Sequence, residues 1–188
     1  MILSDRDIKA RLARGDLGIA PLEDPEVQIQ PANVDLRLGN RFRVFRISST
    51  PFIDTRDATK KDYTEELIIP DGERFIVHPG EFILASVKEY IKLPADLMGA
   101  VDGRSSLGRV GLVVHSTSAT INPGWEGELV LEMTNIGKMP VAIYPNQRIA
   151  KLVLHLLSSP AERPYQAHAE AKYKGGQKFG EGKMHEEK

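Results

Sequence analysis

The chain has 188 residues, no cysteine and a formal net charge of -1 at pH 7. This length suits one domain with a hydrophobic core, and no charge-free apolar run approaches the ~20 residues of a membrane-spanning helix. The lack of cysteine and of a basic, apolar leader favours the cytoplasm. A near-zero net charge gives no general attraction for nucleic acid, so any anion must be bound by a local cationic cluster. We expect a soluble protein that binds a small anion, not a nucleic acid or a membrane.

The N-terminal residues predict a short helix. Ser4 and Asp7 resemble a capping box in which Asp replaces the usual Glu. Ile8 and Leu12 recur on one face of the helix, and Gly15 is typical of the residue that follows a helix end.

From residue 28 onward the pattern indicates short strands. Alternating or β-branched runs are separated by turn residues such as Pro70-Asp71-Gly72 and Asn122-Pro123-Gly124. Many short strands at this spacing predict a mainly β sandwich or barrel. Residues 56–66 are polar and predict an exposed loop. The expected strands cover residues 34–38, 42–47, 74–77, 82–87, 110–114, 129–133, 141–144 and 149–157.

After Pro164 the chain becomes polar and glycine-containing, and it ends in charged residues. A segment of this composition has few residues that could join a core. We expect a single β domain over residues 1–165 and a polar, flexible C-terminal tail over residues 166–188.

Residues 102–109, Asp-Gly-Arg-Ser-Ser-Leu-Gly-Arg, combine two glycines, two hydroxyls and two guanidiniums. Gly103 and Gly108 allow a tight turn that a ligand can approach closely. Arg104 and Arg109, with the serine hydroxyls, supply donors that suit a phosphate. The order matches neither the P-loop nor the Rossmann fingerprint. On the residues alone, the run is either an ordinary turn or an anion site.

A carboxylate stands in the middle of the expected strand at residues 129–133. Alternation places Leu129, Leu131 and Met133 on one face and Glu132 on the other. Glu132 then lies either on a solvated outer face or in a functional site. A buried carboxylate has a raised pKa and makes a competent general base and acid, whereas a neighbouring guanidinium acts in the opposite direction.

The composition excludes one class of metalloenzyme. Zinc deaminases of bases hold their metal with a His or Cys and two further cysteines, and this chain has no cysteine. Its histidines show neither the H-E-x-x-H spacing nor an i, i+4 pair. We therefore expect no metal centre built by the protein. The histidines are His78, His115, His155, His168 and His185.

Several motifs in a fixed order resemble dCTP deaminase, and the similarity runs through nearly the whole chain. The resemblance implies a dUTPase-like β-barrel or sandwich with a short N-terminal helix, assembled as a homotrimer whose active sites lie where subunits meet. It also implies metal-free hydrolysis of dCTP to dUTP and ammonia in pyrimidine deoxynucleotide synthesis. The motifs lie at residues 4–8, 34–39, 78–82, 103–109, 115–117, 121–127, 130–132, 160–165 and 172–173.

The resemblance assigns catalysis to three residues. Glu132 would activate the water that attacks C4 of cytosine and then protonate the departing amine, while Ser105 and Arg109 would hold the water and stabilise developing charge. The tail would close over the nucleotide, and Mg²⁺ would accompany the triphosphate, without zinc. The substrate contacts would be Arg104, Ser105, Ser106, Leu107, Gly108, Arg109, Asn122, Val130, Leu131, Glu132, Tyr165, Lys172 and either Gly176 or Gln177.

Asn122 departs from the family pattern, which usually has Asp at this position. An amide can bind the deoxyribose 3′-hydroxyl but cannot act as a base. Residues 118–120, Ser-Ala-Thr, also lack the aromatic residue associated with the bifunctional branch. Both features favour an enzyme that stops at dUTP. Two alternatives stay open: a hydrolase of the same fold, either a bifunctional deaminase and dUTP diphosphatase giving dUMP or a dUTPase, and a non-catalytic β-sandwich that binds nucleotides or proteins.

Overall fold

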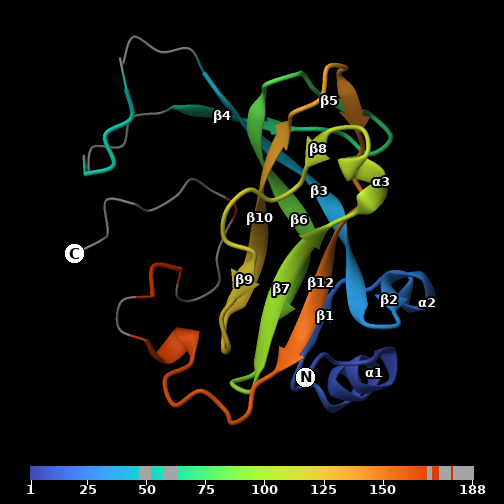
Figure 1. Cartoon of the computed structure of the whole chain (residues 1–188), viewed down its shortest axis with the longest axis vertical. Coiled ribbons are helices and arrows are strands. Elements are labelled where there is room, and N and C mark those ends of the chain that lie inside the picture. The colour runs from blue at the N-terminus through green and yellow to red at the C-terminus, as the bar shows by residue number, and fades with distance from the viewer. Residues whose placement is uncertain (47–51, 57–62, 169–170, 174–178, 180–188) are drawn as a thin grey trace.

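The computed structural model describes residues 1–46, 52–56, 63–168, 171–173 and 179 (Figure 1). Within these ranges, no helix is long and apolar enough to cross a membrane. The helices are α1 (Asp5–Arg14), α2 (Pro25–Gln28), α3 (Ser105–Gly108) and the 3-10 helix η1 (Tyr165–Ala167). The strands are β1 (Gly18–Ala20), β2 (Ile29–Gln30), β3 (Asn33–Phe45), β4 (Thr64–Ile68), β5 (Phe75–Val77), β6 (Phe82–Lys92), β7 (Leu97–Gly103), β8 (Leu112–Val113), β9 (Thr120–Ile121), β10 (Glu126–Asn135), β11 (Val141–Ile143) and β12 (Arg148–Leu156).

Helix α1 begins and ends at the predicted caps. Ser4 Oγ accepts a hydrogen bond of 3.4 Å from the main-chain nitrogen of Asp7. Gly15 ends the helix with a φ of 76°, a conformation that glycine adopts without steric cost. Ile8 is fully buried and Leu12 packs beside the core, as their spacing on one face predicts. Helix α1 therefore covers one end of the sheet (Figure 1).

One large antiparallel sheet carries the fold. Its strand order is β8-β10-β6-β3-β12-β7-β9, and β1 joins β6 while β2 and β4 join β3. Strands β5 and β11 form a separate antiparallel pair. The long strands run side by side in Figure 1, with α1 and α2 on one side and the C-terminal segment on the other. The predicted mainly β fold with a short N-terminal helix is confirmed.

The core follows from alternation along the long strands. Val34, Leu36 and Leu38 of β3 are fully buried on one face. Further along the same strand, Phe42 stacks on Phe75 with ring centroids 4.6 Å apart. Burial of these apolar side chains supplies the main stabilisation of the fold, at about 25 cal/mol per Å² of apolar area.

Two strand predictions were wrong in extent. The strands expected at 34–38 and 42–47 form the single strand β3, because Gly39 lets it approach Ser86, where an added Cβ would lie 2.2 Å from Oγ. The loop expected at 56–66 overlaps β4, which begins at Thr64 and pairs with β3. Thr64 is only 2% exposed despite its polar neighbours. Pairing with β3 therefore overrides the polar composition.

Strand β7 was not predicted, because its sequence, Leu-Met-Gly-Ala-Val-Asp-Gly, contains two glycines. Gly99 packs against β12, where an added Cβ would lie 3.0 Å from Leu152 Cδ1. This glycine therefore marks a close approach between strands and not a loop. The strand expected at 110–114 is also shorter than predicted, since β8 covers only Leu112–Val113.

Candidate active site

Glu132 lies in the middle of β10, on the face turned away from the core. Its neighbours Leu131 and Met133 are 1% and 0% exposed, so the alternation of the strand directs Glu132 to the opposite side. The Glu132 side chain is half-buried, and its Oε2 accepts a hydrogen bond of 2.6 Å from Thr117 Oγ1. Ser116 Oγ donates to the main-chain oxygen of Glu132 over 2.9 Å. The carboxylate is thus held in place by the segment that precedes β9.

A cavity of about 350 Å³ lies beside Glu132. This volume falls in the range typical of small-molecule sites. A β-bulge between Glu128 and Val130 interrupts the alternation of β10, so Leu129 is only half-buried and lines the cavity together with Val130. Apolar residues of the sheet and polar residues of the loops share the lining: Leu84, Val101, His115, Ser118, Thr120, Ile121, Asn122, Trp125, Leu129, Val130, Leu131, Glu132, Tyr165 and Tyr173.

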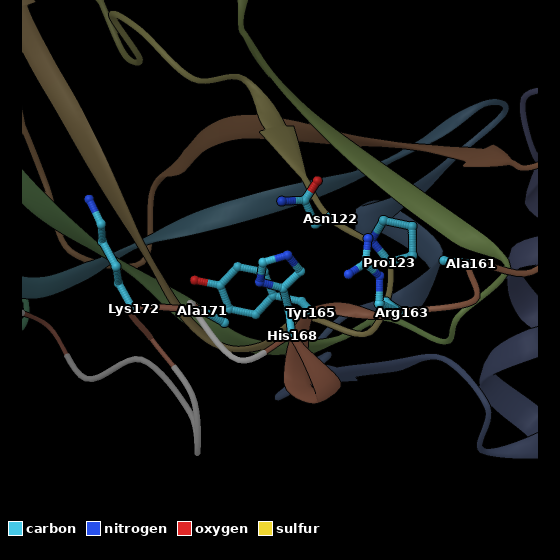
Figure 2. Close-up of a pocket in the computed structure, with 8 residues that line it drawn as sticks. All are labelled: Asn122, Pro123, Ala161, Arg163, Tyr165, His168, Ala171 and Lys172. Carbon is cyan, nitrogen blue, oxygen red and sulfur yellow. The ribbon is translucent and has the colours of Figure 1, made fainter. Parts of the chain in front are cut away.

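A second cavity, of about 480 Å³, shares Asn122 and Tyr165 with the first. In Figure 2, Asn122, Tyr165 and His168 gather in its centre, while Arg163 and Lys172 lie on opposite sides. The predicted tail residues Tyr165 and Lys172 are therefore brought to Asn122. Cationic side chains at this cavity suit an anionic ligand.

Pro164 and Tyr165, which lead into the tail, are docked on the Asn122-Pro123-Gly124 turn. Tyr165 donates its main-chain N–H to the carbonyl of Pro123 over 2.8 Å. Gly124 has a φ of 75°, and a Cβ at this position would lie 2.5 Å from Pro164 Cβ. This glycine is required by both its conformation and its close contact with the tail.

The tail also makes a contact further along. Phe179 is 7% exposed, and its main-chain N–H donates to Glu128 Oε2 over 3.3 Å. The Arg41 guanidinium lies over the Phe179 ring, 5.1 Å from its centroid, and also pairs with Glu128. The polar tail therefore carries one apolar side chain that packs against β3 and β10.

The turn at residues 104–109 lines neither cavity. Ser105, Ser106 and Arg109 are exposed, and Leu107 packs partly against the core. In Figure 1, α3 lies away from the C-terminal segment. Neither glycine of the turn adopts a positive φ, and the chain turns here through the single helical turn α3. Within one chain, neither of these two cavities brings Ser105 or Arg109 to Glu132.

Arg104 is held by a buried carboxylate. Asp35 is 1% exposed, and its Oδ2 accepts hydrogen bonds from Nη1 of Arg104 and, over 3.1 Å, from Nη1 of Arg148. Neither Asp35 nor Arg148 was predicted as a site residue from the sequence. The signal in the sequence was Asp35, a charged residue between the apolar residues Val34 and Leu36 of a predicted strand. A carboxylate buried there without a partner would be costly, so its position indicates a cationic partner.

Glu89 is a second buried carboxylate, with 0% exposure. Its Oε1 accepts a hydrogen bond of 2.9 Å from Gln28 Nε2, and its Oε2 accepts one of 2.9 Å from the Arg37 main-chain nitrogen. Burial raises the pKa of Glu89, although these hydrogen bonds act in the opposite direction. Glu89 lines neither cavity and joins α2 to the sheet.

Across the described residues, no group of three or more His, Asp or Glu side chains is arranged to hold a metal ion. The predicted contacts Gly176 and Gln177 lie outside the described residues.

Residues 2–157 match the model of the dCTP deaminase-like family. The chain belongs to this family. It is 51% identical over 174 residues to the dCTP deaminase, dUMP-forming, of Halobacterium salinarum, covering 92% of this chain and 89% of the relative. It is 53% identical over 165 residues to the dCTP deaminase, dUMP-forming, of Methanothermobacter thermautotrophicus, covering 87% of this chain and 83% of the relative. It is 48% identical over 176 residues to the dCTP deaminase of Natronomonas pharaonis, covering 93% of this chain and 90% of the relative.

A solved structure supports the same assignment. The crystal structure of 2′-deoxycytidine 5′-triphosphate deaminase from Agrobacterium tumefaciens aligns with a TM-score of 0.65 at 26% identity. The alignment covers 82% of this chain and 47% of that chain, so this chain spans about half the length of that structure. The family model includes Glu132 and the turn at 104–109 but ends before the tail residue Tyr165. The alternative of a non-catalytic β-sandwich is therefore set aside.

Proposed function

We propose that this protein hydrolytically deaminates dCTP to dUTP and ammonia. The observation that carries the proposal is Glu132, a half-buried carboxylate oriented by Thr117 beside a cavity of nucleobase scale in a chain of the dCTP deaminase-like family. A general base must lie within hydrogen-bond reach of the water that it activates. Similar proteins are named dCTP deaminases, which supports the same substrate.

In the proposed mechanism, Glu132 takes a proton from a water whose oxygen forms a bond to C4 of cytosine. The same carboxyl then delivers this proton to the exocyclic nitrogen, the C4–N bond breaks, and ammonia leaves. The remaining hydroxyl proton moves from the C4 oxygen to N3 as the C4 carbonyl forms. Thr117 occupies Oε2 of Glu132, so Oε1 serves the water. Val130 and Leu131 of β10 line the same cavity, and their main-chain groups would contact the base.

Ser105 and Arg109 complete this site from a neighbouring copy of the chain, in a homotrimer. Two observations support a shared site. The turn at residues 104–109 is separate from the cavity of its own Glu132. Beside that turn, Val110, Ile136 and Met139 are 52%, 73% and 73% exposed, and apolar exposure of this kind is typical of protein interfaces. At the shared site, Arg109 would stabilise the charge that develops on the tetrahedral intermediate.

The triphosphate lies against Arg104, Ser105, Ser106 and the main-chain amides of Leu107 and Gly108. Lys172 and Tyr165 close over it from the tail, with Gly176 or Gln177 as a further contact. Mg²⁺ enters as part of the substrate, bound to the phosphate oxygens. A cytoplasmic location stays a prediction.

The product is decided at Asn122, which lines both cavities. An amide hydrogen-bonds the 3′-hydroxyl but accepts no proton at working pH, so it cannot activate water for attack on a phosphate. The alternative, a bifunctional enzyme giving dUMP, is favoured by the dUMP-forming names of two similar proteins. The amide supports dUTP as the final product.

Chromatography of the nucleotides formed from dCTP, and separately from dUTP, with Mg²⁺ tests this proposal. Accumulation of dUTP and ammonia, with dUTP stable on its own, supports the monofunctional enzyme. Stoichiometric dUMP and pyrophosphate would establish the bifunctional alternative, and unchanged dCTP would reject both. Asn122→Asp, compared in the same assay, introduces the missing carboxylate.

A further inference from the structure

Asp35, Arg104 and Arg148 form a cluster beside the turn proposed to bind phosphate, which we call the Asp35 cluster. Arg148 is the member of this cluster without an assigned role. Asp35 Oδ2 accepts from Arg104 and from Arg148, so two guanidiniums share one oxygen of a single carboxylate. The three groups together carry one positive charge in excess. Such an excess suits a site that must attract an anion.

Strand register brings the two arginines together. Gly103 at the end of β7 lies opposite Ala150 of β12, and Arg104 follows Gly103 directly. Arg148 is the first residue of β12 and lies opposite Arg37 of β3. Both guanidiniums are therefore anchored beside the start of α3. The Arg104 side chain is 21% exposed and that of Arg148 is 39% exposed, so both remain accessible.

The neighbouring charges leave this excess in place. Lys151 lies opposite both Asp35 and Asp102 in the sheet, on the same face, so counting these two further groups adds one positive and one negative charge and leaves the excess unchanged. The Arg37 guanidinium pairs with Glu23 over 3.3 Å. The uncompensated charge therefore belongs to Arg104 and Arg148.

We propose that Arg148 is a second phosphate-binding arginine and that Asp35 is the positioning residue that holds it beside Arg104. This inference rests on the proposed function, which places the triphosphate at this turn. Asp35 fixes one nitrogen of each guanidinium, and the remaining N–H groups of both forks donate to phosphate oxygens. Ser105 and Ser106, exposed directly after Arg104, add hydroxyls to the same patch.

The test measures dCTP deamination by the full-length protein and its variants. Arg148→Ala is expected to raise KM for dCTP by about tenfold or more while kcat stays within about threefold, as loss of a charge-assisted contact made equally in ground and transition states requires. Arg148→Lys keeps the charge but not the fork, so its KM should be intermediate. Asp35→Asn should also raise KM.

Arg14→Ala is the matched control. Asp16 accepts from Arg11 over 2.9 Å and from Arg14 over 3.2 Å, so this variant removes one arginine from a similar cluster at α1. Its KM should equal that of the unmodified protein. Inorganic triphosphate, used as a competitive inhibitor, should lose affinity for Arg148→Ala by the same factor as dCTP.

Failure of the inference is distinct from failure of the proposed function. If the unmodified protein does not deaminate dCTP, the proposed function is wrong. If it does, but Arg148→Ala keeps its KM within twofold, or loses kcat alone, Arg148 is not a phosphate ligand. A lowered Tm without a change in KM would likewise overturn the inference and reduce the cluster to a structural role.

Discussion

Thr117 donates its hydroxyl to Oε2 of Glu132 over 2.6 Å, across a separation of 15 residues in the chain. The bond joins the loop before β9 to the middle of β10. It fixes the orientation of the carboxylate through Oε2, and in the proposed mechanism Oε1 serves the water. A side chain that must move the same proton twice gains from such a fixed position, because both transfers need hydrogen-bond geometry.

Glu132→Gln should abolish deamination while the fold and dCTP binding persist. Glutamine keeps the shape of the side chain but cannot carry a proton, so kcat should fall by at least the ~10²–10⁴-fold typical of a lost general base. Steady-state kinetics and calorimetric binding of dCTP check this. Thr117→Val, which removes only the orienting bond, should lower kcat by about tenfold. Near-normal turnover by Glu132→Gln would disprove the mechanism.

Mixing two inactive variants should restore activity if sites are shared between copies. In trimers assembled from Glu132→Gln and Arg109→Ala chains, some sites combine an intact Glu132 with an intact Arg109 of the neighbour. Random assortment restores about a quarter of the sites in an equal mixture, provided that the interface joins two copies. The two proteins are unfolded together, refolded and assayed, with each variant refolded alone as the control. A mixture as inactive as its components would place the site within one chain.

Truncation after Pro164 should reduce dCTP turnover strongly and lower Tm by no more than about 5 °C. The truncated protein loses Tyr165 and Lys172 from the second cavity but keeps the β core. Phe179→Ala is the companion variant, because it removes the buried tail contact alone. Kinetics and thermal unfolding separate the two effects. Unchanged kinetics after truncation would show that the tail does not cover the substrate.

Glu89 should make the protein less stable as pH rises, relative to Glu89→Gln. Burial raises the folded-state pKa of Glu89 above its ordinary 4.5. Its stabilising contribution is therefore present below pH 4.5 and is lost as pH rises through the folded-state pKa, since the unfolded chain ionises first. Urea unfolding at fixed protein concentration between about pH 4 and 7 measures the difference between the two proteins. As pH rises, the free energy of unfolding of the unmodified protein should fall relative to that of Glu89→Gln. A difference between the two proteins that stays constant with pH would contradict a raised pKa of Glu89.

Local signals in the sequence were sufficient for the elements that local chemistry determines. The caps of α1 at Ser4 and Gly15 were predictable because each acts within a few residues. Alternation likewise placed Leu131 in the core and Glu132 on the opposite face. The order of several motifs along the chain indicated the family, whereas composition alone could not have identified it.

The remaining features depend on partners distant in the chain. Strand β7 was not predicted, and the close approach that requires Gly99 in it is made by Leu152, more than fifty residues away in the chain. Asp35 was not selected because its two arginines come from β12 and from the end of β7. The separation of Arg109 from Glu132 within one chain could be expected only from the resemblance, since spacing in the sequence does not report assembly.

Gly124 also constrains the design of chimaeras. Its contact with Pro164 fixes the direction in which the tail leaves the β fold. A tail transplanted from another family member would leave the β fold in the same direction only if the host turn kept a glycine at this position. Any Cβ there would clash with the residue at position 164 and displace the transplanted segment. The turn and the tail therefore form one exchangeable module, although about forty residues separate them in the chain.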